Sequence, residues 1–200
     1  MSNLIKPVQS RHGRGWSVVR REDGQRWGVK GKVYVKTQSG YFTHPVMRAG
    51  WPTPTLTVEY NALSTLSRLG IHVPEIVDYR VEDTVIELTI REVADAEPLD
   101  EFLQGTADVE RKDQAVRNLA QQIRNLHTAG WVHGALGNCH ILIQKQDLNV
   151  VLIDFEKARW NPLRRYSDLE RFWRRTACLN EEQSRLFQAV YTGRGSTGTS

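Results

Sequence analysis

Apolar positions recur with helical spacing in two segments of the chain. Within residues 109–127, four apolar side chains follow one another at steps of three and four, so they share one face of a helix. They are Val116, Leu119, Ile123 and Leu126. Residues 55–69 show a shorter apolar stripe. Each segment is followed directly or closely by a glycine, Gly130 or Gly70, a residue typical of helix ends. The pattern predicts a helix over each segment.

Strand-like patterns, rich in β-branched and aromatic residues, occur before and after the helix at 55–69. The predicted strands cover residues 16–20, 32–37, 75–81, 84–90, 140–143 and 150–153. Asp23-Gly24 is a turn signal between the first two. Further helices are predicted at 99–103, 168–178 and 181–191. The order is strands, helix, strands, and then mostly helices with one strand pair, which predicts an α+β chain with two lobes.

Composition narrows the class of protein without naming a function. The chain has 200 residues, 40% of them hydrophobic, which suffices for a real core. A net charge of +4 suits an anionic partner, although a mildly basic surface explains it equally well. Cys139 and Cys178 show neither metal-binding spacing nor a disulfide framework, and Cys139 is interpreted as a packed thiol. Without a signal peptide or an apolar run of about 20 residues, we expect a cytoplasmic protein, with peripheral membrane contact left open.

Two charged residues stand where the pattern calls for apolar ones. Lys36 lies inside a predicted strand, where a half-buried lysine is costly unless its charge is matched. Glu59 shares the apolar face of the first helix with Leu63 and Leu66. Each has an ordinary explanation, as a lysine on an edge strand and as an acid near a helix N-terminus. Together they could instead form an ion pair that orients a phosphate-binding lysine.

A histidine-containing loop and an aspartate at a strand end follow the long helix. The loop, residues 131–138, contains His133 and Ala135 and leads to His140 at the start of a strand. The next strand ends in Asp154. An aspartate at the end of an apolar strand is well placed to hold a divalent cation, although a simple turn acid fits the same position.

Taken in order, these elements resemble the signature set of the protein kinases. His140 lies five residues after Ala135, as the metal-binding asparagine of kinases follows the catalytic aspartate, and Asp154 lies nineteen residues after Ala135. The resemblance implies a two-lobed protein-kinase-like fold with a small β-rich N-lobe and a trimmed, mostly helical C-lobe. The implied division is an irregular N-terminus (1–15), an N-lobe (16–92), a C-lobe (93–192) and a flexible tail (193–200).

Among kinase-like proteins, the chain resembles the lipopolysaccharide core kinases that phosphorylate Kdo or heptose, and within them the InaA-type branch. The likeness extends roughly over residues 16–191. The segments that carry it are Tyr34-Val35-Lys36, His44-Pro45-Val46, Gly70-Ile71-His72-Val73-Pro74-Glu75, Gly130-Trp131-Val132-His133-Gly134, Ile153-Asp154-Phe155-Glu156-Lys157-Ala158-Arg159 and Asp168-Leu169-Glu170-Arg171. The family resemblance also implies that Asp168 braces the catalytic loop.

The resemblance implies ATP and Mg²⁺ as cofactors and assigns a role to each candidate residue. Lys36 would hold the α- and β-phosphates, and Glu59 would orient Lys36. Asp154 and His140 would hold Mg²⁺, although a histidine is a poorer ligand for Mg²⁺ than an oxygen donor. His133 belongs to the catalytic loop, in which the family motif continues with an aspartate. Here Ala135 stands at that position.

Ala135 leaves two functions open. A positioned base is typically worth about 10²–10⁴-fold in rate, so an ATP-dependent phosphotransferase acting on a lipopolysaccharide core sugar would be weakened. The alternative is a pseudokinase, a nucleotide-sensing or stress-response binding protein without efficient transfer. A nucleic-acid-binding module is disfavoured, because the chain has no zinc pattern and no aromatic RNA-binding strand motif.

The C-terminal half also carries a basic stretch. Its members are Arg159, Arg164, Arg165, Arg171, Arg174 and Arg175. These side chains suit a grip on lipopolysaccharide phosphates or on a membrane face at the cytoplasmic side of the inner membrane, and they equally suit a solvated helix face.

Overall fold

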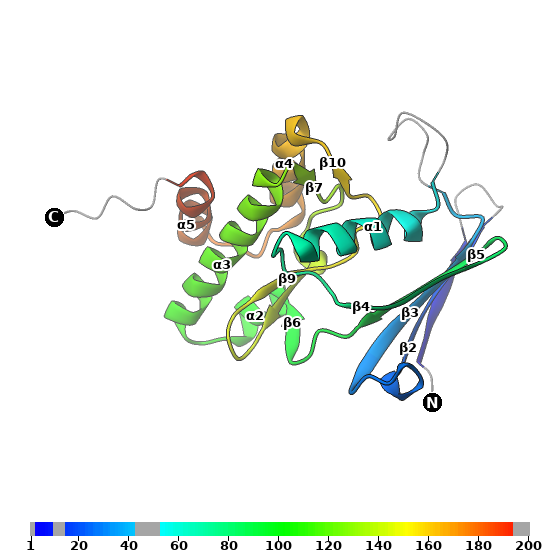
Figure 1. The fold of residues 1–200 in the computed structure, drawn as a ribbon. Helices are drawn as coiled ribbons and strands as arrows, with labels where there is room; N and C mark the ends of the chain where they lie inside the picture. The colour runs from blue at the N-terminus through cyan, green and yellow to red at the C-terminus, as the bar shows by residue number, and fades with distance from the viewer. Residues whose placement is uncertain (1–2, 10–14, 43–52, 194–200) are drawn as a thin grey trace.

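The computed structural model describes residues 3–9, 15–42 and 53–193, and for residues 3–9 it describes the backbone. The chain forms two lobes (Figure 1). The N-terminal lobe is an antiparallel sheet with one helix across it, and the C-terminal lobe is mostly helical. The predicted α+β class with a β-rich first lobe and a helical second lobe is confirmed.

Among the described residues, five strands make the N-lobe sheet, in the order β1-β2-β3-β5-β4, and all neighbours are antiparallel. They are β1 (Asn3–Gln9), β2 (Trp16–Asp23), β3 (Lys32–Ser39), β4 (Ile76–Glu82) and β5 (Val85–Arg91). The short 3-10 helix η1 (Gly24–Trp27) joins β2 to β3, where a turn was expected.

The expectation of an irregular N-terminus over residues 1–15 is wrong for β1. This strand pairs with β2 from Asn3 opposite Arg21 to Gln9 opposite Trp16. Its sequence contains Pro7 and no alternation of apolar and polar residues, so strand formation depends on pairing with β2 rather than on a local signal. The N-lobe sheet therefore begins at Asn3.

Helix α1 (Thr55–Arg68) lies across one face of this sheet, against β4 and β5 (Figure 1). Lys36 in β3 is the pairing partner of Leu88 in β5, so both side chains project from the same face. Leu88 is fully buried in the core with Leu63 and Leu66 of α1. The sheet face that carries Lys36 is therefore the face that α1 covers.

The C-lobe contains four helices and two small sheets. The helices are α2 (Leu99–Gly105), α3 (Val109–Thr128), α4 (Arg165–Arg175) and α5 (Glu181–Thr192). The strands are β6 (Ala96–Pro98), β7 (Trp131–Val132), β8 (Ile141–Gln144), β9 (Val150–Leu152) and β10 (Arg159–Trp160). One sheet has the order β6-β8-β9, and the other pairs β10 with β7. The 3-10 helices η3 (Asn138–His140) and η4 (Pro162–Arg164) complete the lobe.

Helix α3 is the centre of the C-lobe core, as its apolar periodicity predicts. Its four predicted apolar side chains are fully buried, and the helix packs against α5. The side chain of Asp108 accepts hydrogen bonds from the first free amides of α3, and a capping box between Asn180 and Gln183 begins α5. No helix in the described ranges is long and apolar enough to cross a membrane.

Several local expectations need correction or stay untested. The short strands β6, β7 and β10 fall in segments predicted as loop or left unassigned. Cys139, interpreted as a packed thiol, is exposed because it lies in η3 and not in β8. The His44-Pro45-Val46 segment lies outside the described residues, and so does the predicted tail beyond Gly193.

Candidate active site

An ion pair joins strand β3 and helix α1, the two N-lobe elements that carry the unexpected charges. The Nζ atom of Lys36 lies 2.8 Å from both carboxylate oxygens of Glu59. The Glu59 side chain is 0% exposed and that of Lys36 is 13% exposed. Burial alone lowers the pKa of Lys36, but the carboxylates of Glu59, Asp154 and Glu156 outweigh it and hold this pKa above its usual range. Lys36 is therefore a fixed cation at the inner face of the sheet.

Asp154 approaches the same lysine from the C-lobe. Its Oδ1 lies 3.7 Å from Nζ of Lys36, and its Oδ2 lies 3.1 Å from Nε2 of His140. Burial raises the pKa of Asp154, but the hydrogen bond from His140 and the charge of Lys36 outweigh this and hold it below its usual range. Asp154 has a φ of 67°, a left-handed conformation that Asp tolerates better than most residues and that recurs at functional sites.

The orientation of His140 follows from its second contact. Its Nδ1 lies 2.9 Å from the carbonyl oxygen of Ala135, which can only accept a hydrogen bond, so Nδ1 carries a proton. Nε2 is the nitrogen that faces Asp154. Both ring nitrogens therefore face acceptors, and the hydrogen bond to Asp154 raises the pKa of His140. A metal ion bound at Nε2 would take the place of that proton, with Nδ1 still held by the carbonyl of Ala135.

His133 is built into the loop on both sides of its ring. Its Nε2 donates to the carbonyl of Ile153 at 2.8 Å, and its Nδ1 accepts from the amide of Ala135 at 3.3 Å. Burial lowers the pKa of His133 and thus favours the neutral ring. Both ring nitrogens are engaged, so His133 connects the loop to the strand that precedes Asp154.

Asp168 of α4 braces the same loop. Its carboxylate accepts from the amide of His133 at 2.7 Å and from the amide of Gly134 at 2.9 Å, and Nε2 of His127 lies 3.3 Å away. The backbone needs glycine here, because Gly134 has a φ of +78° and a Cβ would come within 2.4 Å of the Lys157 carbonyl oxygen. The bracing position that the resemblance implied for Asp168 agrees with these contacts.

Two arginines of α4 also contact the loop, and sequence reasoning placed neither of them in the site. Nη1 of Arg175 donates to the carbonyl of Ala135 at 3.2 Å, and Nη1 of Arg171 donates to the carbonyl of Gly134. The stem of Arg175 covers Gly137, where an added Cβ would lie 3.0 Å from Cβ of Arg175. A cation therefore stands beside Ala135, at the position where the kinase loop carries its aspartate.

Glu156 is a further half-buried acid beside Lys36 that sequence reasoning did not select. Its Oε1 accepts from Nε2 of Gln38 in β3 at 3.1 Å. Burial, together with the neighbouring Asp154 and Glu59, raises the pKa of Glu156 to about 7, although Lys36 acts in the opposite direction. The only sequence signal was its position two residues after the candidate metal ligand.

The donor atoms at this point suit a hard cation. Glu59, Asp154 and Glu156 each offer a carboxylate oxygen, and these atoms lie within 4.8 Å of one another. Mg²⁺ prefers oxygen ligands, commonly one or two carboxylates together with substrate phosphates. Since Glu59 is engaged by Lys36, Asp154 and Glu156 are the carboxylates left for a cation. The residues present therefore fit the predicted Mg²⁺ at Asp154, with His140 beside it.

The linker between the lobes, which begins at Glu92, is tied to the sheet face that carries Lys36. Both Nε and Nη2 of Arg21 donate to the carboxylate of Glu92, each at 2.8 Å, and the hydroxyl of Tyr34 donates to Glu92 at 3.1 Å. Tyr34 lies two residues before Lys36 and hence on its face of β3. These bonds fix the start of the linker against the sheet.

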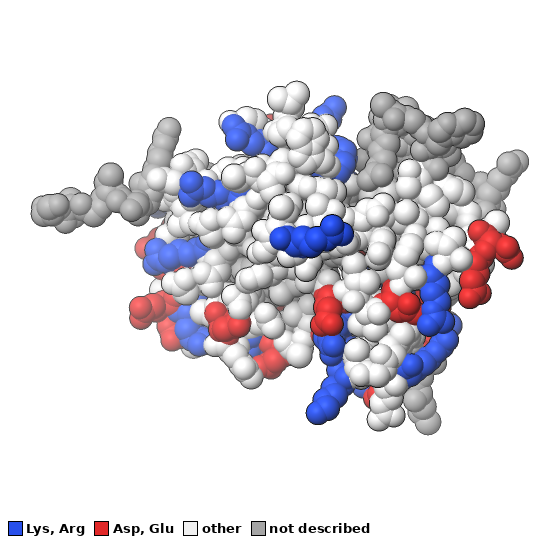
Figure 2. Space-filling view, in the orientation of Figure 1, with Lys and Arg blue, Asp and Glu red and all other residues white. Residues whose placement is uncertain are grey.

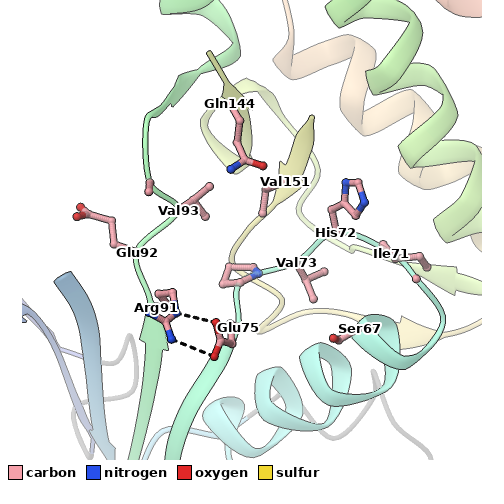
Figure 3. Close-up of a pocket in the computed structure, with 13 residues that line it drawn as sticks. Ser67, Ile71, His72, Val73, Glu75, Arg91, Glu92, Val93, Gln144 and Val151 are labelled. Atoms are coloured by element: carbon pink, nitrogen blue, oxygen red, sulfur yellow. Dashed lines mark hydrogen bonds and ion pairs between the residues drawn. The ribbon is translucent and has the colours of Figure 1, made fainter. Parts of the chain in front are cut away.

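A pocket of about 500 Å³ lies at the lobe junction, lined by the α1–β4 connection, the linker and strands β8 and β9 (Figure 3). It holds an ion pair between Arg91 and Glu75, with Nε and Oε2 2.6 Å apart. Its lining includes none of the residues that sequence analysis selected for the site. Lys36, Glu59, Asp154 and the catalytic loop therefore lie outside this pocket, whereas Glu92 of the linker belongs to its lining.

The comparisons with known proteins agree with this geometry. An aminoglycoside-3'-phosphotransferase of type VIII superposes with a TM-score of 0.65 at 19% identity, covering 100% of this chain and 88% of the other. Search of curated proteins finds no match. This likeness shows a protein-kinase-like fold, in which Lys36 and Glu59 form the ion pair described above. The model of the lipopolysaccharide kinase (Kdo/WaaP) family matches residues 4–191, and the chain belongs to that family.

Proposed function

We propose that the protein is an ATP-dependent kinase that phosphorylates a sugar hydroxyl of the lipopolysaccharide core, Kdo or heptose, at the cytoplasmic face of the inner membrane. Family membership supports the reaction class and the acceptor. The observation that carries the proposal is the buried ion pair of Lys36 and Glu59, with Asp154 3.7 Å from the same ammonium. Lysine, glutamate and metal-binding aspartate converge in this way in kinases that are ready to bind nucleotide.

Each residue has a defined task in this proposal. Lys36 binds the α- and β-phosphates of ATP, and Glu59 holds its ammonium in place. Asp154 and His140 hold Mg²⁺, with Glu156 as a further oxygen donor. When bound, the ion neutralises charge on the phosphates during transfer.

Helix α4 places cations beside the catalytic loop where kinases carry a base. Arg175 stands beside Ala135 and can stabilise the transferred phosphoryl group, whose charge spreads over its oxygens during transfer. No carboxylate is present at position 135. Transfer therefore relies on positioning and charge stabilisation, and the factor of about 10²–10⁴ from a positioned base is missing.

A pseudokinase is the second candidate function, and Ala135 favours it. The neutral His133 does not replace the missing base, because both its ring nitrogens are bound. In this reading the lysine, glutamate and aspartate bind nucleotide, and the protein senses it rather than using it. Both functions need the nucleotide site, so they differ in phosphate transfer and not in ATP binding.

Two measurements separate these functions. A thermal-shift titration with ATP, with and without Mg²⁺, tests the site, because a ligand at about 100 times its Kd stabilises the fold by roughly 2.7 kcal/mol. We expect a Mg²⁺-dependent shift that Lys36→Ala abolishes. Transfer is then measured with Mg·ATP and dephosphorylated core oligosaccharide. Phosphate incorporation no greater than in Asp154→Ala would reject the kinase and leave the pseudokinase.

A further inference from the structure

Three large apolar side chains project into solvent within seven residues of the C-lobe. Trp160 is 66% exposed, Leu163 is 91% exposed and Tyr166 is 63% exposed. They belong to β10, η4 and the start of α4 in turn. Single exposed apolar residues are ordinary, but an exposed cluster marks an interaction site. We call this cluster the 160–166 patch.

The backbone beneath the patch is held firmly. Trp160 pairs with Trp131 across the two-stranded sheet, and the amide of Asn161 donates to the carbonyl of Gly130 at 2.8 Å. Gly130 allows a close approach, since a Cβ there would lie 2.5 Å from Nε1 of Trp160. The hydroxyl of Ser167 donates to the carbonyl of Arg164 at 2.9 Å and fixes the entry into α4. The patch is thus presented on an ordered platform.

Two arginines lie within the patch segment, between Leu163 and Tyr166. Arg164 and Arg165 are exposed, and within the described part of the chain no carboxylate forms an ion pair with either of them. The guanidinium of Arg165 lies over the ring of Tyr166, 4.9 Å from its centroid. Figure 2 shows Lys and Arg side chains on both sides of a projecting uncharged group at the end of the molecule where Figure 1 places α4 and β10.

The composition of the patch favours a lipid surface over a protein partner. Tryptophan and tyrosine concentrate at membrane interfaces, where their rings sit at the level of the headgroups. An exposed leucine can enter the acyl boundary, and each nearby arginine adds attraction to anionic lipids. A protein partner would need carboxylates opposite the arginines and an apolar pocket for Leu163. An anionic bilayer supplies phosphates for the arginines and an apolar interior for Leu163 in one surface.

Helix α4 connects the patch to the candidate active site. The helix has 11 residues, so it spans about 16 Å. It begins beside the patch and carries Asp168, Arg171 and Arg175 to the catalytic loop. A surface that binds the patch therefore lies within about one helix length of the loop.

We propose that the 160–166 patch, with its arginines Arg164 and Arg165, docks the protein on a bilayer that contains anionic phospholipid. Leu163 enters the acyl boundary, Trp160 and Tyr166 lie among the headgroups, and the arginines contact lipid phosphates. Docking in this way would bring the catalytic loop close to a lipid-linked acceptor, and this benefit rests on the proposed function. Binding to lipid itself does not require any transfer of phosphate.

Vesicle flotation tests the proposal on the full chain without nucleotide or sugar. Wild type is mixed with phosphatidylcholine vesicles that contain or lack phosphatidylglycerol, and we expect it to float with the anionic vesicles alone. Leu163→Ser should weaken binding by about tenfold because its apolar insertion is lost. Arg164→Ala and Arg165→Ala should each weaken it by about fivefold. Since these side chains are exposed, melting temperatures should not change.

Matched controls lie away from the patch. Leu69 at the end of α1 is 55% exposed, and Arg185 on α5 is also exposed, so Leu69→Ser and Arg185→Ala should float as wild type does. Equal flotation of wild type and Leu163→Ser would overturn the proposal, and so would equal binding to both kinds of vesicle. Self-association that Leu163→Ser abolishes, without flotation, would assign the patch to a protein contact instead. Transfer to a soluble acceptor reports on the proposed function independently.

Discussion

The ammonium of Lys36 lies 2.8 Å from each carboxylate oxygen of Glu59, and the two partners depend on each other unequally. Lys36 has Asp154 as a second carboxylate at 3.7 Å. Among the described residues Glu59 makes no other ion pair, and its side chain is 0% exposed. Loss of the lysine therefore leaves a buried carboxylate alone, whereas loss of the glutamate leaves a lysine that still has a partner.

This asymmetry predicts unequal costs of substitution. Lys36→Met should lower the free energy of unfolding by about 3–5 kcal/mol, as expected when a buried pair loses one partner. Glu59→Gln should cost less, because the amide oxygen still accepts from Lys36 and Asp154 remains. Denaturation in urea measures both. The control Lys157→Met removes an exposed lysine and should stay within about 0.5 kcal/mol. A larger cost for Glu59→Gln would contradict the prediction.

The Asp168 brace predicts a pH dependence of stability. Burial raises the pKa of Asp168, but the hydrogen bonds from His127 and from the amides of His133 and Gly134 outweigh it and hold the pKa below its ordinary value of 3.8. A carboxyl group with a lower pKa in the folded state contributes stability above its unfolded pKa and loses it as pH falls through the folded pKa.

Asp168→Asn should therefore lower stability at neutral pH, and the difference from wild type should shrink as the pH falls below about 4. Chemical denaturation at a series of pH values measures this difference. Glu170→Gln, an exposed change on the same helix, should give a small difference that hardly varies with pH. A pH-independent effect of Asp168→Asn would show that its charge has no role in the brace.

Restoring an acid at position 135 tests whether the missing base limits transfer. If the protein is a kinase, Ala135→Asp should raise kcat by up to about 10²–10⁴-fold, the usual contribution of a positioned base. Ala135→Asn has the same size without the carboxylate and serves as the control. A gain in both variants, or in neither, would show that proton acceptance at this position is not what limits the reaction.

Arg175 should affect transfer and leave nucleotide binding nearly unchanged. We expect Arg175→Ala to lower kcat by about 10²-fold, because a group aimed at developing charge acts mainly in the transition state. The thermal shift with Mg·ATP should persist. Arg174→Ala removes the neighbouring exposed arginine and, with a soluble acceptor, should leave kcat unchanged. A rise in KM alone for Arg175→Ala would assign this arginine to acceptor binding.

Local patterns were sufficient for the residues whose signal lies within one element. Lys36 interrupts a strand, Glu59 interrupts an apolar helix face and Asp154 follows an apolar strand, so each was visible from its neighbours. The structure brings these three together, which sequence spacing alone did not show. Helix α3 was equally clear, because its apolar stripe runs unbroken from Val116 to Leu126.

The features that were missed arise from contacts between distant segments. Glu156 contacts Gln38, which lies 118 positions away in the sequence, and Arg175 contacts Ala135, which lies 40 positions away. No local sequence pattern therefore indicates either contact. Strands β7 and β10 have two residues each, which is too few to show an alternation of apolar and polar positions. Strand β1 forms through its pairing with β2, and the exposure of Cys139 follows from a 3-10 turn.

Asp168, Arg171 and Arg175 occupy positions i, i+3 and i+7 of one helix, and all three bond to the catalytic loop. Each residue of an α-helix advances by about 100°, so inserting one residue between Asp168 and Arg175 would turn the guanidinium away from Ala135 while Asp168 stayed in place. The spacing along α4 is thus as strongly constrained as the identity of these residues. Related chains should vary in sequence along the outer face of this helix while tolerating neither insertion nor deletion within it.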